Sequence, residues 1–169
     1  NEVNKVKRFE SGMIVNPVTI FPESSLSEAL EIKKKNNISG IPVVEKGSKK
    51  LIGILTNRDI RFAKNKNQNV KSLMTKTNLI TVSRGISMSA AQKLLHQHRI
   101  EKLLVVDNRY RCVGLITVKD IEKAEKFPFA SKDKMGRLLV GAAIGVGEDQ
   151  GIDRLSHLEK SGVDLVVID

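Results

Sequence analysis

The sequence Gly53-Ile54-Leu55-Thr56-Asn57-Arg58-Asp59-Ile60 decides the fold, because a close copy follows 61 residues later as Gly114-Leu115-Ile116-Thr117-Val118-Lys119-Asp120-Ile121. Upstream, Asn16-Pro17-Val18-Thr19-Ile20 aligns in the same way with Asn78-Leu79-Ile80-Thr81-Val82, at a spacing of 62 residues. The spacing changes by one in the polar turn at 45–50, and turns tolerate single-residue changes in length. The chain therefore contains two tandem copies of one small α/β unit.

Each copy is predicted to form a strand, a helix, two hairpin strands and a second helix. In the first copy the strand is 18–20, a capping box at Ser25 and Glu28 starts a helix that ends near Asn37, and the hairpin strands are 40–44 and 51–55. Thr56 is expected to cap the helix that follows. In the second copy the predicted elements are a helix at 87–97, strands at 102–106 and 112–117, and a helix from Val118. Neither copy can bury both faces of its sheet alone, so the two are expected to pack as a pseudo-symmetric pair.

The character of the sequence changes after the second copy. Residues 122–135 are charged and contain Pro128, which is typical of a linker. An apolar strand in 137–147, a helix and an apolar strand at 162–169 then predict one βαβ unit of a parallel sheet. One such unit cannot complete a barrel, so we expect a truncation at Asp169. The expected organisation is a connection at 1–15, a first copy at 16–66, a linker at 67–77, a second copy at 78–126 and a tail at 127–169.

Composition restricts the class of protein. The chain has 169 residues, of which 40% are hydrophobic and 28% charged, and no apolar run approaches the length of a membrane helix. With no signal peptide visible either, a cytoplasmic location is expected. The single cysteine, Cys112, excludes an internal disulfide framework and a cysteine-based metal cluster. The net charge of +10 suggests nucleic acid, but the cations are scattered and the aromatic content is 4%, so we interpret most of the charge as solvated helix faces and loops. Short anionic ligands are the next alternative, ahead of nucleic acid.

The repeated Thr-x-x-Asp motif is the main candidate site. A hydroxyl and a carboxylate at a strand-to-helix junction suit a nucleotide, because the hydroxyl can contact phosphate and the carboxylate can accept both hydroxyls of a ribose. The candidate residues are Thr56, Arg58 and Asp59 in the first copy and Thr117, Lys119 and Asp120 in the second. The alternative interpretation is that these hydroxyls and carboxylates serve only as helix caps.

No other pattern predicts catalysis or metal binding. Gly145-Val146-Gly147 with an acidic residue at the next strand end imitates a dinucleotide-binding fingerprint, but the third glycine, Gly151, is one residue out of register. The three histidines do not form a ligand cluster, and Cys112 is expected to be buried and structural.

The two copies resemble CBS domains, whose tandem pair, the Bateman module, binds adenosine and guanosine nucleotides at clefts that carry Thr-x-x-Asp. The resemblance implies that Ile41 and Val43, in Ile41-Pro42-Val43, lie along the base. The second copy departs at this edge, with Glu101-Lys102-Leu103-Leu104 where the first has Ser39-Gly40-Ile41-Pro42. A charged, bulkier edge is expected to hinder a ligand in the second cleft.

The flanks resemble the inosine-5'-monophosphate dehydrogenase family. The segments that carry this resemblance are Glu2 to Ile14, the stretch Gly136-Arg137-Leu138-Leu139-Val140-Gly141-Ala142-Ala143 and Gly162 to Asp169. The resemblance implies an α/β fold in which a tandem CBS pair is followed by one βαβ piece of an incomplete (β/α)8 TIM barrel. It further implies that Asp169 contacts the ribose of NAD and that the catalytic cysteine loop lies beyond this chain.

The same resemblance implies the activity and partners of a larger parent. These are NAD-dependent oxidation of IMP to XMP with a monovalent cation, usually potassium, regulatory ATP or GTP at the CBS pair, and a homo-oligomer of four or eight chains. The chain alone is expected to be inactive. Two alternatives stay open: a stand-alone CBS nucleotide sensor, and a nucleic-acid-binding protein, which is suggested only by the charge and would show steep salt dependence.

Overall fold

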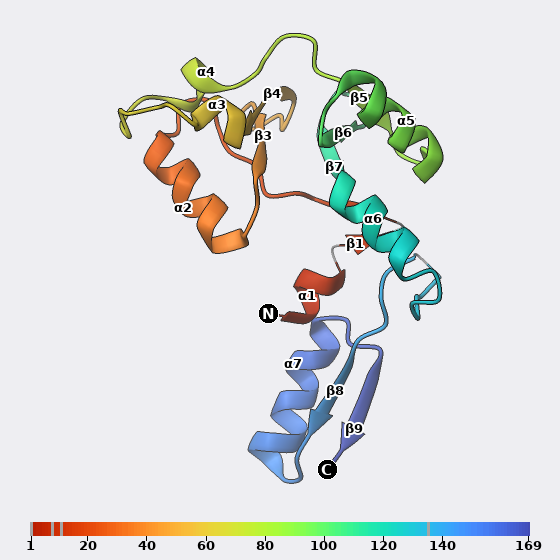
Figure 1. Cartoon of the computed structure of the whole chain (residues 1–169). Helices are drawn as coiled ribbons and strands as arrows, with labels where there is room; N and C mark the ends of the chain where they lie inside the picture. The colour runs from red at the N-terminus through yellow and green to blue at the C-terminus, as the bar shows by residue number, and fades with distance from the viewer. Residues whose placement is uncertain (1, 8, 11, 135) are drawn as a thin grey trace. The chain divides into compact units, whose positions relative to one another are not determined.

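The computed structural model describes residues 2–7, 9–10, 12–134 and 136–169 (Figure 1). The chain divides into two compact units. One unit is residues 16–121, which contain both copies of the repeat up to the first turn of the last helix, and the other combines the residues up to 15 with residues 122–169. The second unit is thus built from two stretches of sequence that lie on either side of the repeats.

The first repeat contains α2 (Leu26–Asn36), β3 (Gly40–Val44), β4 (Leu51–Thr56) and the short helices α3 (Asn57–Ile60) and α4 (Val70–Leu73). The predicted capping box of α2 is confirmed: Glu28 N donates to Ser25 Oγ at 3.2 Å, and Ser25 N donates to Glu28 Oε2 at 3.2 Å. The helix ends at Asn37, which adopts the left-handed conformation with φ 52°. Asparagine tolerates that conformation well, which explains the sharp stop.

The strand predicted at 18–20 is wrong for most of its length. Only Ile20 pairs, in an isolated parallel bridge with Val43, through Ile20 N to Pro42 O at 3.1 Å and Val44 N to Ile20 O at 3.0 Å. Pro22 follows two residues later and has no N–H to continue a ladder. Strands β3 and β4 form the predicted antiparallel hairpin, with Ile41 opposite Leu55.

The second repeat contains β5 (Thr81–Ser83), α5 (Met88–His98), β6 (Lys102–Val106), β7 (Cys112–Thr117) and α6 (Val118–Lys126). Strand β5 runs parallel to β6, and β6 pairs antiparallel with β7. The β6–β7 ladder shifts register between Val105 and Val106, and the β3–β4 ladder shifts at the corresponding Val43 and Val44. The two hairpins therefore have a register shift at the same position of the repeat, in addition to their similar sequences.

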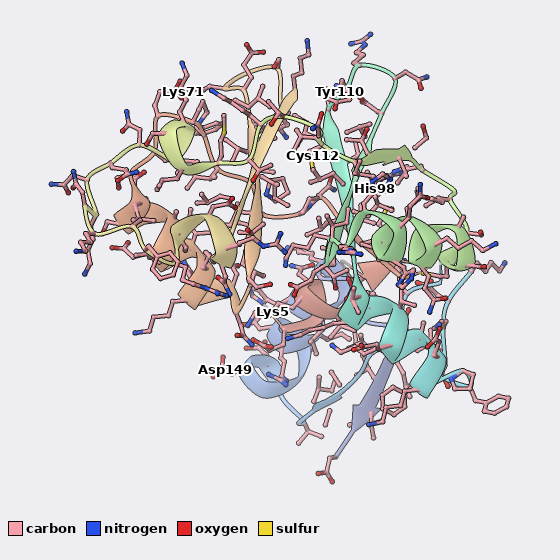
Figure 2. All side chains as sticks on the ribbon, turned by 45° about the horizontal axis from the view of Figure 1, so that its top comes forward. Lys5, Lys71, His98, Tyr110, Cys112 and Asp149 are labelled. Atoms are coloured by element: carbon pink, nitrogen blue, oxygen red, sulfur yellow. The ribbon has the colours of Figure 1, made fainter. Side chains whose placement is uncertain are left out.

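The two repeats meet at the tips of their hairpins. Lys50 and Arg111, which occupy corresponding positions, form an antiparallel bridge, and Leu51 N donates to Tyr110 O at 2.9 Å. Figure 2 shows Tyr110 in the turn that leads into β7 and Cys112 at the start of that strand. Contact between corresponding residues confirms the pseudo-symmetric pairing that the repeat predicts.

Each repeat also has a compact apolar interior. The buried cluster of the first repeat consists of Ile20, Ala29, Ile41, Val43, Leu55 and Val70. In the second repeat the buried residues include Ala91, Leu95, Leu103, Val105 and Ile116. Burial of this apolar area is the main favourable contribution to folding of the unit.

The other unit contains the predicted βαβ piece. Its elements are α1 (Glu2–Lys7), β1 (Phe9–Glu10), β2 (Met13–Val15), β8 (Gly141–Ile144), the π-helix η1 (Glu148–Asp153), α7 (Arg154–Lys160) and β9 (Leu165–Ile168). Strands β8 and β9 are parallel, from Gly141 opposite Leu165 to Ile144 opposite Ile168. The apolar side chains of Leu165, Val167 and Ile168 are exposed.

An ionic cluster joins the two stretches of sequence in this unit. Lys7 Nζ forms an ion pair with Asp164, lies 3.6 Å from Asp133 Oδ2 and donates to Leu138 O at 3.0 Å. Val140 N donates to Asp164 Oδ2 at 2.7 Å. The hydrogen bond from Lys7 lowers the pKa of Asp164, with a further contribution from the Val140 amide.

None of the helices in the described part of the chain is both long enough and apolar enough to cross a membrane.

Candidate functional site

The first Thr-x-x-Asp motif lies where β4 passes into α3. Thr56 N and Thr56 Oγ1 both donate to Asp59 Oδ2, each at 2.6 Å, and Thr75 Oγ1 donates to Asp59 Oδ1 at 2.8 Å. The hydroxyl of Thr56 thus donates to the carboxylate of Asp59, while Asp59 accepts the N–H at the start of the helix. Thr56 is the N-cap residue of α3, as predicted, and forms a capping box with Asp59. Asp59 Oδ2 already accepts two hydrogen bonds and Oδ1 accepts one, so the remaining lone-pair capacity for a ligand is on Oδ1.

A cleft of about 360 Å³ opens at this motif. Both repeats line it: Ser39, Ile54, Thr56, Asn57, Arg58, Asp59, Arg61 and Thr75 come from the first repeat and the linker after it, and Ile100, Glu101 and Lys102 come from the second. We call it the first cleft. The structure therefore brings together Thr56, Arg58 and Asp59, which the sequence predicts as site residues, with residues that it does not predict.

Lys102 is the main contribution of the second repeat to the first cleft. A Cβ atom on Gly40 would lie only 2.8 Å from Lys102 Cδ and Cε, so the lysine stem passes directly over this glycine. The Lys102 side chain is 9% exposed, and its ammonium group lies 3.4 Å from Glu101 Oε2. The edge at 101–102, which the sequence assigns to the second cleft, therefore lines the first.

Lys33 lies behind the wall of the first cleft and was not predicted as a site residue. It is 7% exposed, and its Nζ donates to Asn57 Oδ1 at 2.5 Å. Burial lowers the pKa of Lys33, the positive charge of Lys102 lowers it further, and Asp59 opposes both effects. The sequence contains a signal for this residue: Lys33 follows Leu26, Ala29 and Leu30 at helical spacings of seven, four and three, where an apolar residue is expected.

The second motif has the same internal geometry. Thr117 N and Thr117 Oγ1 donate to Asp120 Oδ2 at 2.9 and 2.7 Å. The neighbouring amides also correspond, since Asn57 N donates to Ser39 O and Val118 N donates to Glu101 O, both at 3.1 Å. Asp120 is 6% exposed, whereas Asp59 is half-buried, and Lys119 is exposed.

Ile41 and Val43 lie away from the first cleft. Both side chains are 0% exposed and pack in the apolar cluster of the first repeat. Alternation along β3 does not expose either one, because every residue of this strand is buried. The expectation that they lie along a bound base therefore has no support in this structure.

Two further residues of interest lie outside the first cleft. Asp169 directly follows β9 and is exposed, and its N donates to Ile144 O at 3.0 Å, so it lies at the carboxyl end of the β8–β9 pair. Cys112 is buried, and burial raises the pKa of its thiol to about 11. A thiol that remains protonated at neutral pH is a poor nucleophile, which agrees with a structural role for Cys112.

Comparison with known families identifies the class of protein that this fold and motif define. The CBS-domain family matches residues 6–66 and 70–126, which together make up most of the chain. The chain therefore belongs to the CBS-domain family, with two copies in tandem.

Individual relatives are more specific. The chain is 56% identical to an inosine-5'-monophosphate dehydrogenase of Rhizobium tropici over 169 residues, 51% identical to that of Aquifex aeolicus over 170 residues and 49% identical to that of Streptococcus pyogenes over 169 residues. In each case the match covers 99% of this chain and 34% of the relative. The chain thus matches the CBS region of these dehydrogenases and spans about a third of their length.

Solved structures show the same arrangement of elements. GMP reductase of Trypanosoma brucei in complex with guanosine 5'-triphosphate matches with a TM-score of 0.84 and 33% identity, over 99% of this chain and 41% of that one. The C318A variant in complex with guanosine 5'-monophosphate matches with a TM-score of 0.83 and 33% identity, over 99% of this chain and 36% of that one.

Proposed function

We propose that this chain is the regulatory part of an IMP dehydrogenase and that a purine nucleotide, ATP or GTP, binds in its first cleft. The observation that carries the proposal is the cleft itself, where a Thr-x-x-Asp motif lies beside the cations Arg58, Arg61 and Lys102. The guanosine 5'-triphosphate complex of a protein with the same arrangement of elements supports a nucleotide as the ligand.

The residues of the first cleft suit the three parts of a nucleotide. Ile54 and Ile100 offer apolar surface for a purine base. The remaining lone pair on Asp59 Oδ1 can accept a hydrogen bond from a ribose hydroxyl. The cations named above can neutralise phosphate oxygens, and Arg58 and Arg61 can do so with two parallel hydrogen bonds each. In the second repeat, Thr117, Lys119 and Asp120 are the corresponding candidates for a second nucleotide.

The parent enzyme would oxidise IMP to XMP with NAD, as the names of the relatives suggest. Of the residues that this resemblance assigns to NAD, the chain contains Asp169, whose exposed carboxylate at the carboxyl end of β9 suits the hydroxyls of a ribose. The activity, the potassium requirement and the assembly into tetramers or octamers all belong to this proposal. A nucleotide in the first cleft would regulate the enzyme if it bound one state of the assembly better than another.

Calorimetric titration of the chain with ATP and GTP tests the proposal. We expect at least one nucleotide to bind, and Asp59→Ala to weaken binding about tenfold or more because it removes the acceptor for the ribose. Asp120→Ala is the matched variant of the second repeat and shows whether that motif contributes. If neither nucleotide binds, the motif serves only as a helix cap.

The parent activity has its own test. A complete protein that contains this chain should form NADH from NAD and IMP, and the added nucleotide should change that rate. A complete protein without IMP oxidation but with nucleotide binding would instead favour the stand-alone sensor.

A further inference from the structure

A buried lysine lies next to the first cleft. Lys33 occupies a position on α2 where Leu26, Ala29 and Leu30 predict an apolar side chain, yet it is 7% exposed. An ammonium group that leaves water without a carboxylate partner is unfavourable. The hydrogen-bond acceptor of Lys33 is instead a neutral amide, Asn57 Oδ1, at 2.5 Å.

The bond from Lys33 determines what Asn57 can offer the cleft. Asn57 lines the first cleft between Thr56 and Arg58. A side-chain amide carries one acceptor oxygen and two donor hydrogens, and here the oxygen is engaged by the lysine. Lys33 therefore orients the amide oxygen toward itself, which favours the NH₂ group as the one that Asn57 offers to a ligand, and the nearby positive charge polarises this donor.

A second cation makes the site still more positive. The charge of Lys102 lowers the pKa of Lys33, which means that the two ammonium groups repel each other. Asp59 partly compensates, and Glu101 lies close to Lys102. A bound anion would relieve this repulsion, because it would interact favourably with both cations at once.

The second repeat has no counterpart of the hydrogen bond from Lys33 to Asn57. The positions that correspond to Lys33 and Asn57 are Leu95 and Val118, neither of which can donate a side-chain hydrogen bond. The position that corresponds to Gly40 carries Lys102, and Lys102 serves the first cleft. The near-identity of the two motifs therefore conceals a difference in charge around them.

We infer that Lys33 is a positioning residue, which acts through Asn57 to make the first cleft selective for the phosphate groups of its ligand. The first cleft therefore prefers nucleoside di- and triphosphates. The second cleft does not share this preference. The inference rests on the proposed function. The inference adds to the proposed function the residue that makes affinity depend on ligand charge, and it adds the difference between the two clefts.

The test is a titration series with adenosine, AMP, ADP and ATP. The chain should bind these ligands with an affinity that rises with the number of phosphates. Lys33→Met keeps the length and burial of the side chain but removes its charge, and it should weaken ATP binding about tenfold while it changes adenosine binding less than about twofold. Lys34→Met, at the next and exposed position of α2, is the matched control and should leave the whole series unchanged.

A second variant keeps the test decisive if Lys33→Met does not fold. Asn57→Asp replaces the donor group with a carboxylate that pairs with Lys33, and it should also remove the dependence on phosphate number. If Lys33→Met weakens adenosine and ATP equally, or weakens neither, Lys33 does not read ligand charge and the inference is wrong. If GTP binds but ATP does not, the same series is run with guanosine, GMP, GDP and GTP; if neither ATP nor GTP binds the unaltered chain, the proposed function itself fails.

Discussion

At the scale of single residues, Lys33 connects stability to ligand selectivity. Its ammonium group is buried against a neutral amide and near a second lysine, and both conditions disfavour the charged form. Proteins retain such unfavourable groups at binding sites, where the same arrangement favours the ligand. The unfavourable burial of the Lys33 charge in the free protein thus accompanies the affinity for phosphate that we infer.

This arrangement predicts that Lys33→Met stabilises the free chain, by about 1 kcal/mol, since replacement of a buried charge by an apolar side chain of similar volume is often stabilising. The pKa of Lys33 lies below its usual value of 10.5 in the folded state, so the loss of stability caused by the buried charge is fully present below the folded pKa. It disappears as the pH rises toward 10.5, because the unfolded chain then releases its proton as well. Urea unfolding near pH 7 and near pH 10 should show a larger gain in stability for the variant at the lower pH. A destabilised variant at neutral pH would show that the bond to Asn57 outweighs the cost of burial.

At the scale of elements, β4 and the segment that leads out of α4 form one support for the motif. Ile54 N donates to Thr75 O at 2.9 Å, and Thr75 N donates to Ile54 O at 3.0 Å. This pair places the Thr75 hydroxyl against Asp59. The close approach depends on Gly53, where a Cβ atom would lie 2.9 Å from Thr75 O and 2.7 Å from Met74 Sδ.

We therefore predict that Gly53→Ala destabilises the unit of residues 16–121 by about 1–3 kcal/mol, as is usual for overpacking in a tight site. It should also weaken nucleotide binding, because Thr75 must move away from Asp59. The control is Gly141→Ala in β8, where a Cβ atom would meet Leu165 at an ordinary distance of 3.9 Å. Thermal unfolding of both variants gives the comparison, and an unchanged midpoint for Gly53→Ala would show that the 70–75 segment shifts without cost.

Sequence reasoning predicts the elements well where the pattern is local. The helix 26–36 follows from its capping box and apolar stripe, and the hairpin strands follow from apolar runs on either side of a polar turn. Prediction fails where tertiary contacts decide. Ile20 pairs at one position only. Lys102 lines the first cleft and Lys33 contacts Asn57 through packing between segments that are distant in sequence.

The site residues show the same division. The motif predicts Thr56, Arg58 and Asp59, which lie together in the cleft. The resemblance also implied Ile41 and Val43, but both belong to the apolar interior, because β3 is buried along its whole length. Charges that act across the interface between repeats, such as that of Lys102 on Lys33, require the fold to be known.

At the scale of the whole molecule, the ionic cluster at Lys7 holds together a unit made from two distant stretches of sequence. Lys7 Nζ connects α1 to Asp164 and to the backbone at Leu138, 131 residues away in sequence. The Lys7 side chain is 8% exposed, whereas that of Asp164 is 26% exposed, so the ion pair is partly open to solvent.

Lys7→Met should loosen this unit, and the effect should depend on pH. The pKa of Asp164 is lowered below its usual value of 3.8 by Lys7, so the stabilisation is present above that value and is lost as the pH falls through the folded pKa. Hydrogen exchange of the Val140 amide, which donates to Asp164, gives the readout. Exchange should be faster in the variant at neutral pH, and the difference should vanish in acid. Lys5→Met removes an exposed lysine of the same helix that pairs with Glu2, and it should leave the Val140 amide protected.

The contact between Gly40 and Lys102 has a consequence for the history of the chain. The two residues occupy the same position in the two repeats, and one lies over the other. When a gene for a single repeat duplicates, both copies first carry the same residue at such a position. Two lysines would repel and collide there, and two glycines would leave a gap. A duplicated ancestor with the same residue in both copies could not fill this space as Gly40 and Lys102 do, so the present contact requires the two halves of the chain to differ at this position.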